Sequence, residues 1–260
     1  MHHAVRMQRT TELGAGQVAA GGDSADASGL FLTENRRLIT RPSSLLQALS
    51  PLEQQKVRSR GHGKIFKAGT KIFSQGTPHD GIFLIESGRV RVFYTAPSGR
   101  EITLAYWSPG NFVGGPEVFD TGIHSWSGIA AADSLIFALR GKALRELVTE
   151  IPALAVGIIE GLAFKGECYS ALAQMLGTRS VTERLIHLLL RLTEIYGVSD
   201  KNSTFIASDF THADLANIVG ATRQWVTATL RRLQDQKILA VSKGRIVVLN
   251  KVALSALQQD

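Results

Sequence analysis

The stretch THADLANIVGATRQWVTATLRRL, residues 211–233, determines how the C-terminal part of the chain folds. Its pattern predicts two short amphipathic helices joined by a turn at glycine. Thr211 and Asp214 have the spacing of a capping box, which begins the first helix. Gly220 lies where the chain must turn sharply, and Thr222 can cap the second helix. The stretch therefore predicts a helix-turn-helix.

The two sides of the second helix differ in chemistry. Val226, Leu230 and Leu233 recur at helical spacing, which predicts a buried stripe. The opposite side carries groups that can read DNA, because the first turns of a recognition helix meet the base edges in the major groove. The predicted base contacts are Thr222, Arg223, Gln224 and Thr227.

A small β-hairpin is predicted directly after these helices. The sequence alternates from Ile238 to Leu249 and pauses at Lys243-Gly244, which is typical of two short strands and a tight turn. This hairpin distinguishes a winged helix-turn-helix, here over residues 181–260, from an ordinary helical hairpin. Its cations would lie near the duplex backbone, where they gain affinity by releasing condensed counterions. The predicted phosphate contacts are Thr211, Arg231 and Lys243.

Composition limits the class of protein. The chain has 260 residues, of which 44% are hydrophobic, enough for two modest cores. No apolar run approaches the roughly 18 residues that span a bilayer, so no membrane partner is expected. The net charge of +7 and the isoelectric point near 9.8 agree with a polyanionic partner such as double-stranded DNA, although they carry no sequence specificity.

Residues 1–42 differ from the rest in composition. They contain AGQVAAGGDSADASG, which is rich in small and polar residues and can bury little surface. We expect a mobile N-terminal extension here. It contains no apolar core of a signal peptide, so the protein is expected in the cytoplasm.

The region from 43 to 145 has the pattern of a β-domain. RVRVFY at 89–94 alternates polar and apolar residues, and EITLAYW at 101–107 follows after a short turn. Several strands at nearly regular intervals predict a double-sheet β jelly roll that closes around an apolar interior.

A long helix is predicted between the roll and the helix-turn-helix, over residues 146–180. Pro152 suits its first turn, and apolar residues recur at roughly heptad spacing. Such a helix can cover the roll on one side and pair with a second copy of the chain on another. A homodimer would present two recognition helices to a palindromic site. The predicted dimer-interface residues are Leu154, Ile158, Leu162, Tyr169, Leu172 and Met175.

The order of these parts resembles the CRP/FNR family of bacterial transcription regulators, over roughly residues 45 to 255. The resemblance implies an α+β fold made of a cyclic-nucleotide-binding-like jelly roll, a dimerisation helix and a winged helix-turn-helix. It also implies an effector bound between the roll and the helix, and RNA polymerase as a partner. The motifs that carry it are GTKIFSQG at 69–76, IFLIESGRVRV at 82–92, PGNFVG at 109–114, VGATRQ at 219–224 and the Lys243-Gly244 wing.

The effector loop departs from the cyclic-AMP-binding members of that family. Those members use a glutamate for the ribose hydroxyl and an Arg-Ser pair for the cyclic phosphate, whereas this chain has Gly115 and Ser125-Trp126 at those places. Because a phosphate buried without a guanidinium partner is costly, we do not expect cyclic AMP as the effector. The expected pocket residues are Tyr106, Phe112, Glu117, Phe119, Ser125 and Trp126.

Three interpretations remain open. Trp126 and its aromatic neighbours could line a site for a small apolar or aromatic effector. Alternatively, the indole fills the pocket and the protein regulates without a small molecule. The third is a cyclic-nucleotide-binding-type module that works through protein contacts and carries a degenerate DNA-binding domain. Steep salt dependence of DNA binding would exclude this last interpretation.

The remaining polar residues do not frame another chemistry. A single cysteine, Cys168, excludes an intrachain disulfide and an iron–sulfur cluster held by one chain. We expect no haem or other cofactor, because His62, His79 and His124 are scattered along the sequence. No nucleophile elbow, phosphate loop or paired metal motif is present, so no catalytic residue and no metal site are predicted. The sequence therefore predicts a DNA-binding transcription regulator and not an enzyme.

Overall fold

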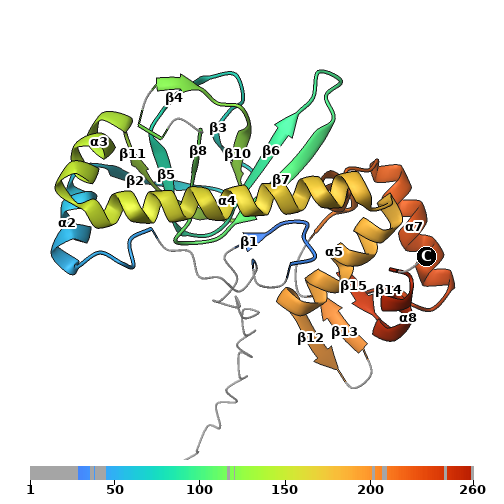
Figure 1. Cartoon of the computed structure of the whole chain (residues 1–260). Coiled ribbons are helices and arrows are strands. Elements are labelled where there is room, and N and C mark those ends of the chain that lie inside the picture. Colours follow the sequence, from blue (N-terminus) through green and yellow to red (C-terminus); the bar gives the residue numbers. More distant parts are fainter. Residues whose placement is uncertain are drawn as a thin grey trace, which may run out of the picture.

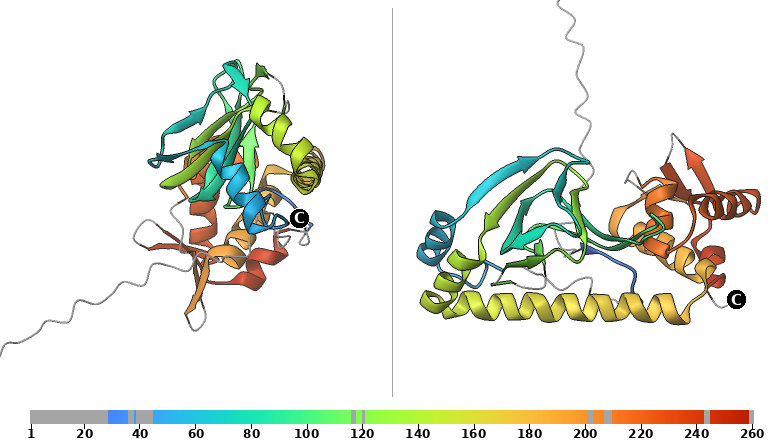
Figure 2. Two further views of the ribbon diagram at one scale, coloured as in Figure 1. Left: turned by 90° about the vertical axis from the view of Figure 1, so that its left-hand side faces the viewer. Right: turned by 90° about the horizontal axis from the view of Figure 1, so that it is seen from above.

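The computed structural model describes residues 29–35, 38, 45–115, 118–119, 121–200, 203–206, 210–242 and 245–258. A β-roll and a C-terminal domain lie side by side, and the long helix α4 (Pro152–Thr178) runs along the roll and ends at the C-terminal domain (Figure 1). At about 1.5 Å per residue, this helix is about 40 Å long. Seen from above, α4 is straight and runs along the roll as far as the C-terminal domain (Figure 2).

The roll consists of two main antiparallel sheets, as the alternating sequence predicted. One has the order β1 (Gly29–Leu30), β7 (Glu101–Trp107), β6 (Val90–Thr95), β10 (Ser127–Ala130) and β3 (Lys71–Phe73). The other has the order β2 (His62–Phe66), β11 (Ser134–Leu139), β5 (Ile82–Ser87) and β8 (Phe112–Gly114). A small third sheet pairs β4 (Pro78–Asp80) with β9 (Thr121–Ile123).

The interior of the roll is apolar and aromatic. Val90, Trp107 and Ile136 are buried in one cluster, which α4 closes with Phe164. A second cluster lies at the far end, where α2 (Pro51–Ser59) and α3 (Gly141–Glu150) pack against the sheets. The predicted jelly roll and the α+β fold are confirmed.

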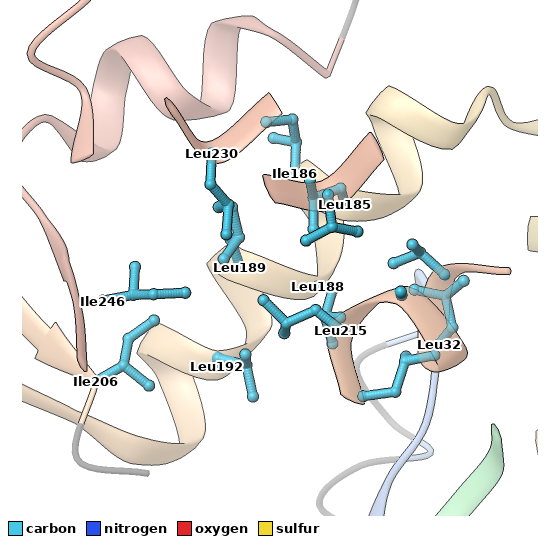
Figure 3. Close-up of a cluster of buried hydrophobic side chains, with 14 of the residues drawn as sticks. Leu32, Leu185, Ile186, Leu188, Leu189, Leu192, Ile206, Leu215, Leu230 and Ile246 are labelled. Carbon is cyan, nitrogen blue, oxygen red and sulfur yellow. The ribbon is translucent and has the colours of Figure 1, made fainter. Parts of the chain in front are cut away.

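The C-terminal domain combines helices with a four-stranded sheet. Its elements are α5 (Val181–Tyr196), β12 (Gly197–Asp200), β13 (Ser203–Ile206), α6 (His212–Val219), α7 (Arg223–Asp235), β14 (Leu239–Ser242), β15 (Arg245–Val248) and α8 (Lys251–Ala256). The sheet has the order β12-β13-β15-β14. Leu189, Leu215 and Leu230 meet in the core, where three helices converge (Figure 3).

The predicted mobile extension over residues 1–42 needs a correction within its described part. Gly29 and Leu30 pair with Trp107 and Tyr106 of β7 and so add a strand to the roll. Phe31 and Leu32 are only 4% and 3% exposed. The physical reason is that GLFL is an apolar run. Its burial offsets the conformational entropy lost when these residues become ordered, whereas the polar residues before it bury too little apolar surface to do so. Residues 1–28 lie outside the described part of the chain.

The roll and the C-terminal domain contact each other directly. The guanidinium of Arg89 lies 5.5–5.6 Å from the ring centroids of Tyr106, Tyr196 and Phe210, and it donates a hydrogen bond to the Tyr196 hydroxyl. At the tip of the β6–β7 hairpin, the Arg100 guanidinium donates to the carbonyl oxygen of Gly220. These contacts join the β6–β7 hairpin and Arg89 before it to α5, to Phe210 and to the turn after α6.

Candidate nucleic-acid interface

Helix α6 begins and ends as the sequence pattern requires. The Thr211 hydroxyl accepts a hydrogen bond from the Asp214 N–H at 3.1 Å, and the Thr211 N–H donates to the Asp214 carboxylate at 2.9 Å. This is the reciprocal capping box. The helix ends at Gly220, whose φ of 69° and ψ of 42° lie in the left-handed region that favours glycine. The turn therefore sets the angle between α6 and α7.

Helix α7 has one buried side and one exposed side. Thr222 caps its start by accepting a hydrogen bond from the Trp225 N–H at 3.2 Å. Val226, Leu230 and Leu233 are at most 2% exposed, which confirms the predicted stripe. Thr229 is buried on the same side, although its polar side chain gave no such signal.

The exposed side of α7 forms an open hollow of about 760 Å³. The four predicted base contacts all lie on it, and Arg231 follows one turn further along. The lining residues are Thr222, Arg223, Gln224, Thr227, Ala228 and Arg231. The helix start, with its positive dipole end, lies at the same edge and favours an anion. The surface thus combines donors for base edges with positive charge for phosphates.

One polar contact between the two helices was not predicted from the sequence. The Nδ1 atom of His212, the first residue of α6, lies 2.9 Å from the Thr227 hydroxyl. That hydroxyl donates to the carbonyl oxygen of Arg223 at 2.9 Å. No spacing rule links His212 to Thr227, because they lie on different helices. Only the angle set at Gly220 brings them together.

The strands of the predicted wing are present. β14 and β15 pair antiparallel, from Leu239 opposite Val248 to Ser242 opposite Arg245. The Arg245 guanidinium lies 5.5 Å from the ring centroid of Phe205 on β13. Lys243, the predicted phosphate contact at the wing tip, lies outside the described residues.

The residues predicted to form one effector pocket do not converge. Tyr106 faces the C-terminal domain, where its ring lies 5.6 Å from that of Phe210. The reason is that successive residues of a strand point to opposite faces, so Trp107 fills the roll and Tyr106 cannot. Phe119 lies under Arg145 of α3, and Ser125 is exposed. Glu117 lies outside the described residues.

Aromatic rings occupy the space between the roll and α4. Trp107 lies 6.0 Å from Phe164 and 6.4 Å from Tyr169, and Trp126 lies 6.1 Å from Tyr169. The buried amine of Lys165 lies 3.9 Å from the Trp107 ring centroid and 4.8 Å from that of Phe112. Burial lowers the pKa of the Lys165 ammonium to about 7. Of the predicted pocket residues, only Phe112 and Trp126 lie near this cluster.

The predicted dimer residues on α4 also need a correction. Leu154, Ile158, Leu172 and Met175 are at most 4% exposed within their own chain, so they cannot form a surface for a second copy. Tyr169 packs against Trp107, and Leu162 is exposed at 39%. The outer face of α4 instead presents Val156, Ile159, Ala163, Gly166, Ser170 and Ala173, three and four positions apart, with the exposed Glu160 and Glu167 beside them.

Two of the three scattered histidines come together in the fold. His79 and His124 are buried with ring centroids 5.0 Å apart, next to Phe73, whereas His62 is exposed on β2. Within the described residues, no three His, Cys, Asp or Glu side chains are placed to hold a metal ion. Cys168 is fully buried in the roll cluster. None of the helices in the described part has the length and apolar character needed to cross a membrane.

Comparisons with known proteins match the two parts of the chain separately. Residues 64–150 match the family model described as cyclic nucleotide-binding domain, and residues 183–257 match the Crp-like helix-turn-helix domain. The chain is 30% identical to the global nitrogen regulator of Synechococcus elongatus over 207 residues, which cover 76% of this chain and 93% of that protein. It is 26% identical to the cyclic AMP receptor protein of Thermus thermophilus over 206 residues, covering 79% and 92%.

A solved structure shows the same architecture. A CRP/FNR-family transcriptional regulator from Thermus thermophilus matches with a TM-score of 0.59 and 27% identity, covering 76% of this chain and 99% of that one.

Proposed function

The chain belongs to the CRP/FNR family of transcription regulators, and we propose that it binds a palindromic site in double-stranded DNA as a homodimer. The observation that carries this proposal is the exposed side of α7. Donor and acceptor side chains gather there at the start of a helix whose other side is buried, as a recognition helix requires.

We assign the reading of bases to the first turns of α7. The Arg223 guanidinium suits a bidentate contact with guanine, and the Gln224 amide suits the edge of adenine. Thr222 and Thr227 complete the base-reading set. Thr211, Arg231 and Lys243 would hold phosphates, which fix the register of the protein on the duplex.

The homodimer would form through the outer face of α4. Six of its exposed residues, Val156 to Ala173, follow one another in steps of three and four, the spacing of a coiled-coil seam. From Ala163 to Ala173 they are small, and a Cβ atom added at Gly166 would meet no atom within 4 Å. Two such helices can approach closely, which would place two recognition helices on one face of the duplex.

We further propose that cyclic AMP is not the effector of this regulator. Ser125 is exposed at the place of the phosphate-binding arginine, and Trp126 packs against Tyr169. A ligand at a hundred times its Kd would stabilise the protein by about 2.7 kcal/mol. We therefore expect no rise in melting temperature with millimolar cyclic AMP. A rise accompanied by tighter operator binding would overturn this part. The proposed setting is the cytoplasm, with RNA polymerase as a partner and no catalytic activity.

DNA binding is tested by selecting a site from random palindromes and measuring affinity across a range of salt concentrations. We expect Arg223→Ala to lose about 1–3 kcal/mol of binding free energy and to relax preference at one base pair per half-site. Arg232→Ala is the matched control, because Arg232 is exposed on α7 but does not line the hollow. Selection of no site, together with weak salt dependence, would instead support an interaction module.

A further inference from the structure

The contact between His212 and Thr227 constrains how α7 can read one base pair. Thr227 lies in the middle of the hollow, between Arg223 and Arg231 along the helix. Its hydroxyl is in contact with two protein groups: the Arg223 carbonyl oxygen and the His212 Nδ1 atom, each at 2.9 Å. Both contacts lie within the protein, before any DNA is bound.

The hydrogen-bonding capacity of the hydroxyl follows from its single proton. A threonine hydroxyl has one donor and two acceptor lone pairs. Its proton is directed to the carbonyl oxygen four residues back, a common arrangement for threonine in helices. His212 must then donate through Nδ1–H, which occupies one lone pair. Thr227 consequently has no proton left for an acceptor on a base.

The methyl group is fixed by the same contacts. Both the hydroxyl and the methyl group are attached to Cβ, so holding the hydroxyl at two points holds χ1 and the methyl group with it. Ala228 follows directly, and it also lines the hollow with a methyl group. This part of the hollow is therefore apolar, whereas the part around Arg223 and Gln224 is polar.

We infer that Thr227 recognises the C5-methyl group of a thymine, and that His212 is the positioning residue that makes this contact specific. Thymine presents the only methyl group in the major groove, and apolar contact with it is a standard means of recognition. Guanine, which offers only acceptors there, gains no hydrogen bond from this hydroxyl. The inference rests on the proposed DNA binding and adds to it the chemical feature read at one position.

The test replaces each thymine of the selected operator, one at a time, with deoxyuridine. Deoxyuridine keeps the hydrogen-bonding groups of thymine and lacks only the methyl group. We expect one position per half-site at which this change weakens wild-type binding by roughly 4-fold, the value of one buried methyl group.

Two variants of Thr227 form a matched pair. Thr227→Val keeps a methyl group and removes the hydroxyl, so it should still distinguish thymine from deoxyuridine. Thr227→Ser keeps the hydroxyl and removes the methyl group, so it should lose that distinction. Thr227 is exposed, and thermal melting will show that both variants fold. A Thr227→Ser variant with the full wild-type distinction would overturn the inference.

The role of His212 is tested in combination with Thr227. His212→Ala should reduce the distinction in the wild-type background, because only the bond to the Arg223 carbonyl oxygen then holds the hydroxyl, and χ1 can turn more freely. In the Thr227→Val background the same change should have no effect, since no hydroxyl remains to be held. Equal effects in both backgrounds would show that His212 does not act through Thr227.

Failure of this inference can be told apart from failure of the proposed function. If a palindromic site is selected and Arg223→Ala changes its preference, but no thymine responds to deoxyuridine, only the inference is wrong. If no site is selected at all, the proposed function is wrong and the inference falls with it.

Discussion

Helices α4 and α7 both separate the interior of the chain from a surface available to a partner, but they do so with different chemistry. α7 has apolar residues inward and polar residues outward, so polarity marks its exposed side. α4 has apolar residues on both sides. Large residues such as Ile158 and Phe164 face the roll, whereas small ones such as Ala163 and Gly166 face outward.

From Ala163 to Ala173, the outward residues of α4 are small, although Val156 and Ile159 nearer its start are large and exposed. Large side chains maximise burial against an irregular roll, and small ones allow a second, identical helix to approach closely. A surface for DNA must instead offer hydrogen-bond donors and positive charge. Under the proposed function, the exposed faces of the two helices thus differ in composition because their partners differ.

Truncating a buried side chain on the inner face of either helix should lower the free energy of unfolding by a similar amount. This is the largest effect that we expect. Phe164→Ala and Leu230→Ala each remove a buried side chain, and each should lower the free energy of unfolding by about 2–5 kcal/mol. Chemical denaturation measures both values. A loss for Phe164→Ala no larger than that for Leu52→Ala, an exposed control on α2, would contradict the assignment of Phe164 to the inner face of α4.

The outer faces should respond differently to the same substitution. Ala163→Glu places a charge in the proposed dimer seam, where burial without a partner costs about 2–3 kcal/mol or more, so the chain should become monomeric. Ala228→Glu on α7 should leave the dimer intact and weaken DNA binding by charge repulsion. Sedimentation and DNA titration distinguish these outcomes. A dimeric Ala163→Glu protein would place the interface elsewhere.

Lys165 is the exception on the inner face of α4, and it gives a smaller, pH-dependent effect. Its folded-state pKa of about 7 lies below the ordinary value of 10.5 because the ammonium is buried. Between these pH values the unfolded chain binds one proton more than the folded chain, so this group makes the free energy of unfolding rise with pH.

Comparison with Lys165→Met isolates this contribution. The wild-type protein should gain about 2 kcal/mol relative to the variant between pH 7 and pH 9. Denaturation of both proteins at the two pH values measures the difference. A constant difference would mean that the amine keeps its proton on folding.

The same contrast between the helices explains what the sequence could predict. The buried side of α7 was evident from the sequence, because apolar residues recur along only one side of this helix. On α4 two phases are apolar, so periodicity alone could not separate Leu154 and Leu172 from Val156 and Ala173. Strand β7 posed the same problem. In LAYW at 104–107 both the odd and the even positions are apolar, so alternation did not show which side chains face the interior of the roll, and Tyr106 was wrongly predicted to do so.

Contacts between distant segments were beyond any local pattern. His79 meets His124, and His212 meets Thr227, only after the sheets and helices are assembled. The short run GLFL at 29–32 was included in the predicted mobile extension because the residues around it are polar, although its own residues are apolar. In each case the deciding partner lies far away in the sequence.

Strand β1 has a consequence for how the chain is made. Leu32 packs in the core that contains Leu188 and Leu215 (Figure 3). A ribosome delivers a chain from its N-terminus at about 5–20 residues per second, so Leu32 emerges well before those partners exist. Until the last third has been synthesised, Leu32 lacks these core partners, and its apolar side chain is a target for chaperones. Leu32 thus acquires its full set of native contacts only after the C-terminal domain has been made.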